Sequence, residues 1–181
     1  MRNSRWSWPL RAISISPTGS AALSGSEMAQ RSKKLTIAVL RSTAALRAAI
    51  DSRVPVLGIC LGLQAMFASS EEAPAELGLD LIHQQVKALP KNVKSPHIGW
   101  NQVRRLRPGI LLERIAEDAY FYFAHSYAAA ACEPHTAAVC DHGFPFAAVI
   151  EHDNLIAVQF HPEKSGEAGA AILRNFVEWA Q

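Results

Sequence analysis

The 181-residue sequence has few cysteines and no long apolar run. Its three cysteines, Cys60, Cys132 and Cys140, are too few for the dense disulfide framework of a small secreted domain, so we expect a reducing, cytoplasmic compartment. No apolar run approaches the roughly 18 residues that a membrane-spanning helix needs, which excludes that class of protein. A net charge of only +2 gives no reason to expect nucleic acid or a membrane surface as a partner.

Acidic residues are almost absent from the first 41 positions, where Glu27 stands among seven Lys or Arg residues and many serines. This composition is typical of a disordered tail or of a transit peptide, and it equally fits a misassigned start or a frameshifted 5′ end. The sequence alone leaves these alternatives open for residues 1–42. We therefore expect an atypical, disordered segment over residues 1–34 and one domain over residues 35–181.

Regular elements are expected from Leu35 onward. The apolar, partly β-branched run Leu35–Leu40 predicts a strand, the Ala/Leu-rich run Thr43–Ile50 predicts a helix, and Val54–Leu57 predicts a second strand. A strand, a helix and a strand in this order indicate a parallel sheet covered by helices. The ligand crevice of such a sheet lies at the carboxyl ends of its strands.

The second half of the chain has short strands separated by tight turns, which indicates a mixed sheet. The expected fold class is α/β, with a three-layer open mixed sheet that carries helices on both faces. The further elements expected are a helix start at Gln64–Ala68, extended pieces in Leu77–Leu89, a loop at Pro96–Asn101, one or two helical turns at Leu111–Ala116, strands at Tyr120–Ala124, Ala137–Cys140, Phe146–Ile150 and Leu155–Phe160, and a helix at Glu167–Trp179.

The most informative motif is Gly58-Ile59-Cys60-Leu61-Gly62, between an expected strand and an expected helix. Glycines on both sides of a nucleophile permit the strained, close-packed turn of a nucleophile elbow, as in the pattern G-x-S-x-G. The positive end of the following helix favours a thiolate at Cys60. By itself the motif also fits a buried structural cysteine in a tight turn.

A second motif, Gln159-Phe160-His161-Pro162-Glu163, ends the expected strand Leu155–Phe160. A histidine at the carboxyl end of a strand in the same sheet lies on the same edge as Cys60, where it can act as the base for the thiol. Glu163 can then hold the far nitrogen of the His161 ring and fix its tautomer. Together the two motifs favour a Cys-His-Glu triad over a surface turn.

These motifs, with Pro96–Asn101, Phe123–Tyr127 and the run His161–Phe176, resemble the class I glutamine amidotransferases, and among them the glutaminase subunits of imidazole glycerol phosphate synthase. The resemblance covers roughly Thr43–Ala180 and implies a flavodoxin-like amidotransferase fold. It implies hydrolysis of glutamine to glutamate and ammonia without a cofactor. The ammonia would pass to a (βα)8-barrel cyclase subunit, the partner in a heterodimer, for the synthesis of imidazole glycerol phosphate and AICAR in histidine biosynthesis.

The resemblance also implies roles for single residues. Cys60 would be the nucleophile, His161 the general base and then acid, and Glu163 the residue that orients the imidazole. The residues implied to bind the substrate are Leu61, through its backbone N–H at the oxyanion, and Gln64, Ser126 and Tyr127. The residues implied to face the cyclase are His97, Trp100, Asn101, Tyr122 and Lys164.

One element of that family is missing from the sequence. A Pro-Gly-x-Gly loop supplies a second oxyanion donor in these glutaminases, but the only glycines upstream of Cys60 are Gly19, Gly25 and Gly58. Loss of one such donor costs roughly 100- to 1000-fold in rate. The sheet would lack its N-terminal strands or fill their places with unrelated sequence. Two alternatives therefore stay open: an impaired chain that binds the cyclase without efficient hydrolysis, and a different amidotransferase.

A zinc site is a further alternative. Cys132, His135, Cys140 and His142 offer four possible ligands, but their spacing fits no common zinc pattern and they span what is expected to be a hairpin. We therefore expect no metal.

Overall fold

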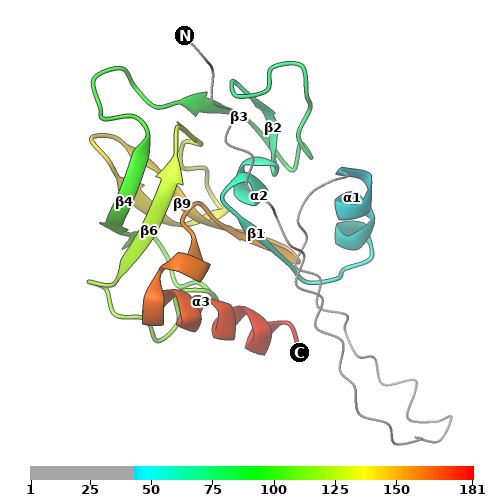
Figure 1. Cartoon of the computed structure of the whole chain (residues 1–181). Helices are drawn as coiled ribbons and strands as arrows, with labels where there is room; N and C mark the ends of the chain where they lie inside the picture. Colours follow the sequence, from blue (N-terminus) through cyan, green and yellow to red (C-terminus); the bar gives the residue numbers. More distant parts are fainter. Residues whose placement is uncertain (1–42) are drawn as a thin grey trace, which may run out of the picture. The chain divides into compact units, whose positions relative to one another are not determined.

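The computed structural model describes residues 43–181. The expected N-terminal segment 1–34 and the expected strand Leu35–Leu40 lie outside the described residues. The elements are α1 (Thr43–Asp51), β1 (Val56–Ile59), α2 (Leu61–Gln64), β2 (Phe67–Ser70), β3 (Ile82–Ala88), β4 (His97–Gln102), β5 (Arg104–Arg105), β6 (Tyr120–His125), β7 (Tyr127–Ala128), β8 (Thr136–Asp141), β9 (Pro145–His152), β10 (Leu155–Val158), the 3-10 turn η1 (Pro162–Lys164) and α3 (Gly166–Trp179) (Figure 1).

The central sheet has five strands in the order β1-β10-β9-β8-β5. Strands β1 and β10 are parallel, with Ile59 paired to Val158, whereas the other neighbours in this sheet are antiparallel. The expected mixed sheet is therefore confirmed. Two smaller groups of strands accompany it, β2-β3-β7 and the two-stranded β4-β6.

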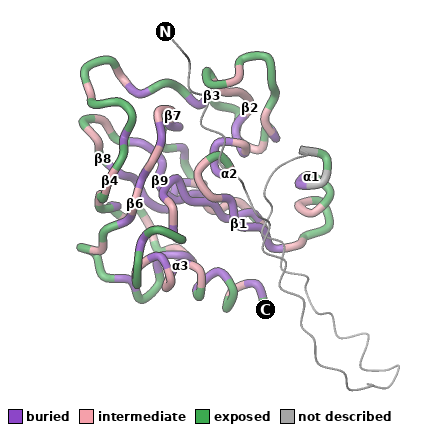
Figure 2. The backbone as a smooth tube through the Cα atoms, in the orientation of Figure 1, coloured by how far each residue is buried: buried purple, intermediate pink, exposed green. Residues whose placement is uncertain are grey.

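Strand β10 has a continuous apolar sequence because both faces of the central sheet are covered. Its side chains alternate between two buried clusters: Leu155 and Ala157 point to one, and Ile156 and Val158 to the other. Figure 2 shows its two neighbours in the sheet, β1 and β9, coloured as buried over most of their length.

Helices from different parts of the chain cover the two faces. Ile172 and Phe176 of α3 belong to the same cluster as Ile156, whereas Leu46 of α1 and Leu63 of α2 belong to the cluster of Leu155. This arrangement confirms the α/β class with helices on both faces. No helix among residues 43–181 is long and apolar enough to cross a membrane.

The helix expected at Gln64–Ala68 is wrong. Helix α2 ends at Gln64, and Phe67–Ser70 is strand β2, which runs parallel to β3. The carbonyls of Ala65 and Met66, which would continue the helix, instead accept hydrogen bonds from the backbone N–H groups of Leu79 and Leu81. Long-range backbone pairing has thus replaced the local helical bonds.

Two other expectations are corrected. The expected loop Pro96–Asn101 is largely strand β4, which pairs antiparallel with β6 along its whole length. Leu111–Ala116 forms turns but no helix, because Arg114 within it has φ 58°, which a right-handed helix does not allow.

The expected strand at Val54–Leu57 is present but displaced to Val56–Ile59.

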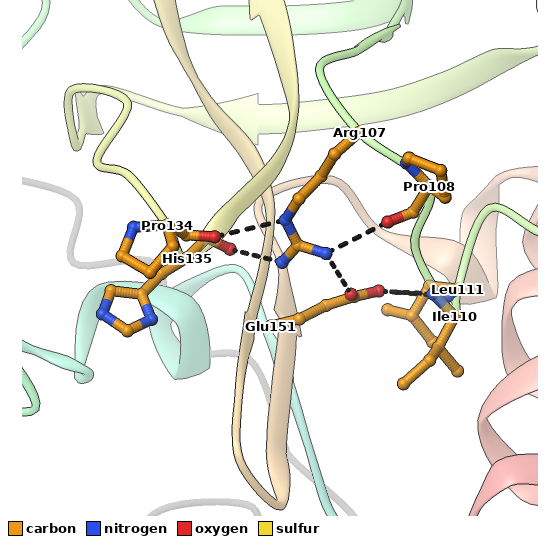
Figure 3. A network of polar contacts seen from close by, with 7 residues as sticks. All are labelled: Arg107, Pro108, Ile110, Leu111, Pro134, His135 and Glu151. Atoms are coloured by element: carbon orange, nitrogen blue, oxygen red, sulfur yellow. Dashed lines mark hydrogen bonds and ion pairs between the residues drawn. The ribbon is translucent and has the colours of Figure 1, made fainter.

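A polar network joins two loops to strand β9 (Figure 3). The carboxylate of Glu151 accepts hydrogen bonds from the Arg107 guanidinium at 3.0 Å and from the Ile110 N–H at 2.7 Å. The same guanidinium donates to the carbonyls of Pro108 and Pro134. Loops without regular hydrogen bonds are thereby held against the sheet by one partly buried carboxylate.

Candidate active site

Cys60 lies where β1 turns into α2. Its backbone has φ 51° and ψ −100°, a positive φ that is uncommon for a residue with a side chain. Gly58 makes this turn possible, since a Cβ there would lie 2.9 Å from the backbone of Gly62 and 3.0 Å from Ala157. The sharp turn predicted from the motif is therefore present, with the cysteine at its apex.

His161 lies three residues beyond β10, on the edge of the sheet where Cys60 also lies. Its backbone N–H donates to the Tyr122 carbonyl at 2.8 Å, which anchors the residue to β6. Its Nδ1 lies 2.7 Å from Oε1 of Glu163, and its side chain also forms a hydrogen bond with Cys60. The structure thus brings the three residues predicted for the triad into one hydrogen-bonded row.

The charges of this row favour a protonated imidazole. The hydrogen bond with Cys60, followed by that with Glu163, raises the pKa of His161 to about 9, against the opposing effect of burial. Partial burial on its own would raise the pKa of the Glu163 carboxyl, but hydrogen bonds from His161 and from the backbone hold that pKa below its usual value. At neutral pH the site therefore holds an imidazolium between a sulfur and a carboxylate.

The other two cysteines have different surroundings. Cys132 and Cys140 are buried, at 6% and 1% exposure, in the two core clusters. Burial, followed by the nearby charge of Asp141, raises the pKa of Cys140 to about 12, so its thiol stays neutral. Only Cys60 combines partial exposure with an adjacent histidine.

A pocket of about 330 Å³ opens beside Cys60. The four residues predicted to bind the substrate, Leu61, Gln64, Ser126 and Tyr127, all line it. Four further lining residues, Pro96, Ile98, Ala124 and His125, come from the motifs Pro96–Asn101 and Phe123–Tyr127, and Glu72, which no motif includes, completes the lining. Glu72 is the only carboxylate among them, and nothing in its local sequence signals a site.

The residues predicted to face a partner fall on two faces of the β4-β6 ribbon. Trp100 is 55% exposed and packs edge-on against the Tyr122 ring, with ring centroids 6.0 Å apart. The ammonium of Lys164 lies 5.5 Å from the centroid of the same tyrosine ring. His97, by contrast, is only 4% exposed, and Asn101 lies on its side of the strand, so the expectation that His97 lies at a surface is corrected.

His97 belongs to a buried cluster of histidines under this ribbon. Its Nδ1 lies 3.0 Å from Nε2 of His125, and its ring stacks on that of His142 with centroids 3.9 Å apart. Burial, helped by the neighbouring histidines, lowers the pKa of His97 to about 3. Burial likewise lowers the pKa of His125 to about 4, although a hydrogen bond to the Tyr127 carbonyl opposes the shift. Both rings are therefore neutral near pH 7.

The possible zinc ligands do not converge. His135 stacks on His152, His142 stacks on His97, and the sulfur of Cys132 lies 3.6 Å from the Thr136 hydroxyl. Within residues 43–181, no group of three or more His, Cys, Asp or Glu side chains is arranged to hold a metal ion.

A cysteine on a strand-to-helix elbow lies beside a histidine and a glutamate that follow the adjacent strand β10, an arrangement typical of thiol-dependent acyl transfer. The family description "Glutamine amidotransferase class-I" matches residues 30–179, and the chain belongs to this family.

Comparison with individual relatives points to one kind of subunit within this family. The chain is 52% identical over 125 residues to the imidazole glycerol phosphate synthase subunit HisH of Pasteurella multocida, which is 68% of this chain and 62% of that protein. It is 53% identical over 124 residues to the HisH subunit of Methanothermobacter thermautotrophicus, with the same shares of each chain. It is 48% identical over 136 residues to that of Moorella thermoacetica, or 75% of this chain and 65% of the relative. The chain thus matches less than two thirds of the length of each.

Solved structures support the fold. A putative GMP synthase protein from Thermoplasma acidophilum superposes with a TM-score of 0.58 at 22% identity, over 76% of this chain and 63% of that one. The glutaminase domain of Trypanosoma brucei CTPS superposes with a TM-score of 0.51 at 18% identity, over 75% and 65%. These similarities confirm the expected amidotransferase-like fold.

Proposed function

We propose that the chain is a glutaminase that hydrolyses glutamine to glutamate and ammonia, as the glutaminase subunit of an imidazole glycerol phosphate synthase. The observation that carries the proposal is the row Cys60, His161 and Glu163 at one end of the parallel pair β1 and β10. The relatives at 48–53% identity are HisH subunits of imidazole glycerol phosphate synthase, which supports this synthase over other amidotransferases.

The proposed reaction begins with Cys60. Its sulfur attacks the side-chain carboxamide carbon of glutamine, and the C=O electron pair moves to the oxygen. The backbone N–H of Leu61 can donate to that oxygen, because it is in the first turn of α2 and has no carbonyl of a preceding turn to bond. His161 then gives its proton to the amide nitrogen, the C–N bond breaks, and ammonia leaves a glutamyl thioester.

The second half-reaction returns the site to its resting charges. Neutral His161 accepts a proton from water as the water oxygen attacks the thioester carbon. The tetrahedral intermediate collapses with expulsion of the Cys60 thiolate and release of glutamate. Glu163 stays ionised throughout and stabilises the imidazolium at both stages.

The pocket beside Cys60 supports glutamine as the substrate. An amino acid bound through its side chain must place an ammonium and a carboxylate elsewhere in the site. The Glu72 carboxylate lines the pocket and is suited to the α-ammonium, whereas Ser126 and Tyr127, which also line it, offer neutral polar groups. We assign substrate binding to these residues together with Gln64.

The proposed partner is the cyclase, in a heterodimer. The outward face of the β4-β6 ribbon exposes Ile98, Trp100 and Tyr120, and Ile98 also lines the pocket. An exposed apolar face of this kind is typical of a protein interface, and tryptophan is enriched among residues that dominate binding energy. A partner seated there would lie next to the pocket in which ammonia is released.

A second candidate function is binding of the cyclase without efficient hydrolysis. The observation that favours it is the absence of a Pro-Gly-x-Gly sequence upstream of Cys60. Among residues 43–181, the Leu61 N–H would then be the oxyanion donor that remains, with a cost of roughly 100- to 1000-fold in rate.

Glutamate release from purified chain, measured with the cyclase and the cyclase ligand present, tests both candidates. Hydrolysis that is lost in Cys60→Ala and retained in Cys140→Ala supports the glutaminase, since the Cys140 thiol lies in the core. Turnover no faster than that of Cys60→Ala, from a chain that still binds the cyclase, overturns it in favour of the second candidate.

A further inference from the structure

Gln159 is the first residue after β10 and lies opposite Cys60 in the parallel pair, one step beyond Ile59 and Val158. It is completely buried, at 0% exposure, and its backbone N–H donates to the Ala148 carbonyl. A polar side chain at such a position must find its hydrogen bonds inside the protein. Two contacts satisfy it, and both belong to the active site.

Those contacts are with the nucleophile and with a residue of the pocket. Nε2 of Gln159 lies 3.5 Å from Sγ of Cys60, and its Oε1 lies 3.2 Å from Nε2 of Gln64. Gln64 in turn places the same Nε2 2.9 Å from the backbone carbonyl of Tyr127. The result is one series of hydrogen bonds that runs from the Tyr127 carbonyl through Gln64 and Gln159 to the Cys60 sulfur.

The Tyr127 carbonyl fixes which way the amide groups of Gln64 and Gln159 are turned. The Tyr127 carbonyl can only accept, so Gln64 must turn its nitrogen, not its oxygen, toward it. That nitrogen also faces Gln159, which must therefore present its oxygen to Gln64. The nitrogen of Gln159 is then left for Cys60. The Nδ1–H of His125 donates to the same Tyr127 carbonyl at 2.9 Å, which agrees with that carbonyl acting as an acceptor.

Two consequences follow for the site. The Cys60 sulfur faces an N–H donor, which stabilises negative charge on it. Both hydrogens of the Gln64 amide are used by Tyr127 and Gln159, so the atom that Gln64 can offer to a ligand in the pocket is its carbonyl oxygen.

We propose that Gln159 is a positioning residue of the active site, with two separable tasks. Its amide nitrogen stabilises negative charge on the sulfur of Cys60 when the charge forms, and its amide oxygen holds Gln64 with its acceptor toward the substrate. The inference rests on the proposed function in so far as Cys60 is its nucleophile. It adds a residue whose side-chain hydrogen bonds within residues 43–181 go to Cys60 and Gln64 rather than to the His161–Glu163 pair.

Two variants separate the tasks. Gln159→Met keeps the approximate shape and removes both polar atoms. Gln159→Glu keeps an acceptor for Gln64 but loses the amide donor to Cys60. Gln84→Met and Gln84→Glu, at an exposed position of β3, are the matched controls. Each protein is tested at pH 8 for the rate of Cys60 alkylation by iodoacetamide, followed by peptide mass spectrometry, and for kcat and KM with glutamine.

We expect both Gln159 variants to slow Cys60 alkylation by roughly tenfold or more, as for loss of a hydrogen bond to a charged group. We expect a raised KM for glutamine in Gln159→Met and a nearly unchanged KM in Gln159→Glu. A residue that only supports the fold would behave differently, because a loosened elbow exposes Cys60 and speeds its alkylation.

Alkylation at the wild-type rate or faster in both variants overturns the inference, and so does an equal KM increase in both. These results leave the proposed function intact, because alkylation requires no turnover of glutamine. Hydrolysis that survives Cys60→Ala overturns the proposed function instead.

Discussion

The backbone N–H of Cys60 donates to the carbonyl of Val158 at 2.8 Å, which carries the pairing of β1 and β10 one residue past the end of β1. Because the two strands stay in register to this point, Cys60 leaves its strand level with Gln159, and His161 follows two residues later. The backbone ladder of two adjacent parallel strands therefore sets the relative position of the nucleophile and the histidine.

The elbow depends on Gly58. We expect Gly58→Ala to lower the free energy of unfolding by about 1–3 kcal/mol, since its Cβ would meet the backbone of Gly62 at 2.9 Å. The matched control is Gly62→Ala, where a Cβ has nothing within 4 Å and the residue lies in a helix. Chemical denaturation of both variants measures the difference. Equal destabilisation would contradict the role assigned to the close approach at Gly58.

We expect Glu163 to contribute to glutamine hydrolysis by stabilising the positive charge of His161. We expect Glu163→Gln to lower kcat for glutamine hydrolysis by roughly 100- to 10,000-fold, because the imidazolium loses its ionised partner at Nδ1. The control is Glu167→Gln, an exposed residue in the first turn of α3. Steady-state glutamate release measures the effect, and a Glu163→Gln enzyme within threefold of wild type would count against the triad.

Stability should fall on the acid side because of two buried histidines. The pKa values of His97 and His125 lie near 3 and 4 in the folded chain, below the value of 6.5 for an unfolded histidine. The unfolded chain therefore takes up protons first, so the full stability is present above about pH 6.5 and is lost as the pH falls to about 4 for His125 and to about 3 for His97. Urea denaturation as a function of pH should show a shallower acid loss in His97→Gln than in wild type.

The effect of His161 on the pH dependence of stability should have the opposite sign to that of His97 and His125. Its folded pKa of about 9 exceeds the unfolded value, so its stabilisation is complete below about pH 6.5 and is lost as the pH rises through about 9. In the same urea series, His161→Gln should flatten the alkaline side and leave the acid side unchanged. The reverse pattern would show that the two groups of histidines have been assigned wrongly.

The exposed Trp100 should dominate binding of the cyclase. We expect Trp100→Ala to weaken that complex by roughly 30-fold or more, the effect of losing a central interface residue. Leu77→Ala, at an exposed apolar residue outside the ribbon, is the control and should not change the affinity. Titration calorimetry with the purified cyclase measures both. Equal affinities for the two variants would place the interface elsewhere.

Much of the fold follows from local sequence patterns. The helix at Thr43–Ile50, the strand at Tyr120–Ala124 and the helix at Glu167–Trp179 are confirmed because apolar periodicity and burial agree there. The strand within Pro96–Asn101 has no such local signal, since its proline, glycine and asparagine favour a loop. Its pairing with β6, which decides the matter, joins residues distant in the sequence.

In the candidate site, too, some features follow from local sequence motifs and others depend on contacts between distant parts of the sequence. The two motifs are sufficient to predict that Cys60, His161 and Glu163 come together, because each motif ends a strand of one sheet. Glu72 and the orientation of Gln159 could not be predicted. Glu72 reaches the pocket only because α2 stops early and β2 follows it, and the direction of the Gln159 amide depends on the carbonyl of Tyr127, far from it in the sequence.

Covalent labelling with a glutamine-derived electrophile, 6-diazo-5-oxo-L-norleucine, tests the central claim most directly. We expect one adduct per chain, located by mass spectrometry on the peptide that contains Cys60, formed more slowly with added glutamine and strongly reduced in His161→Gln. An adduct on Cys132 or Cys140, or no adduct on Cys60 when the cyclase and the cyclase ligand are present, would contradict it.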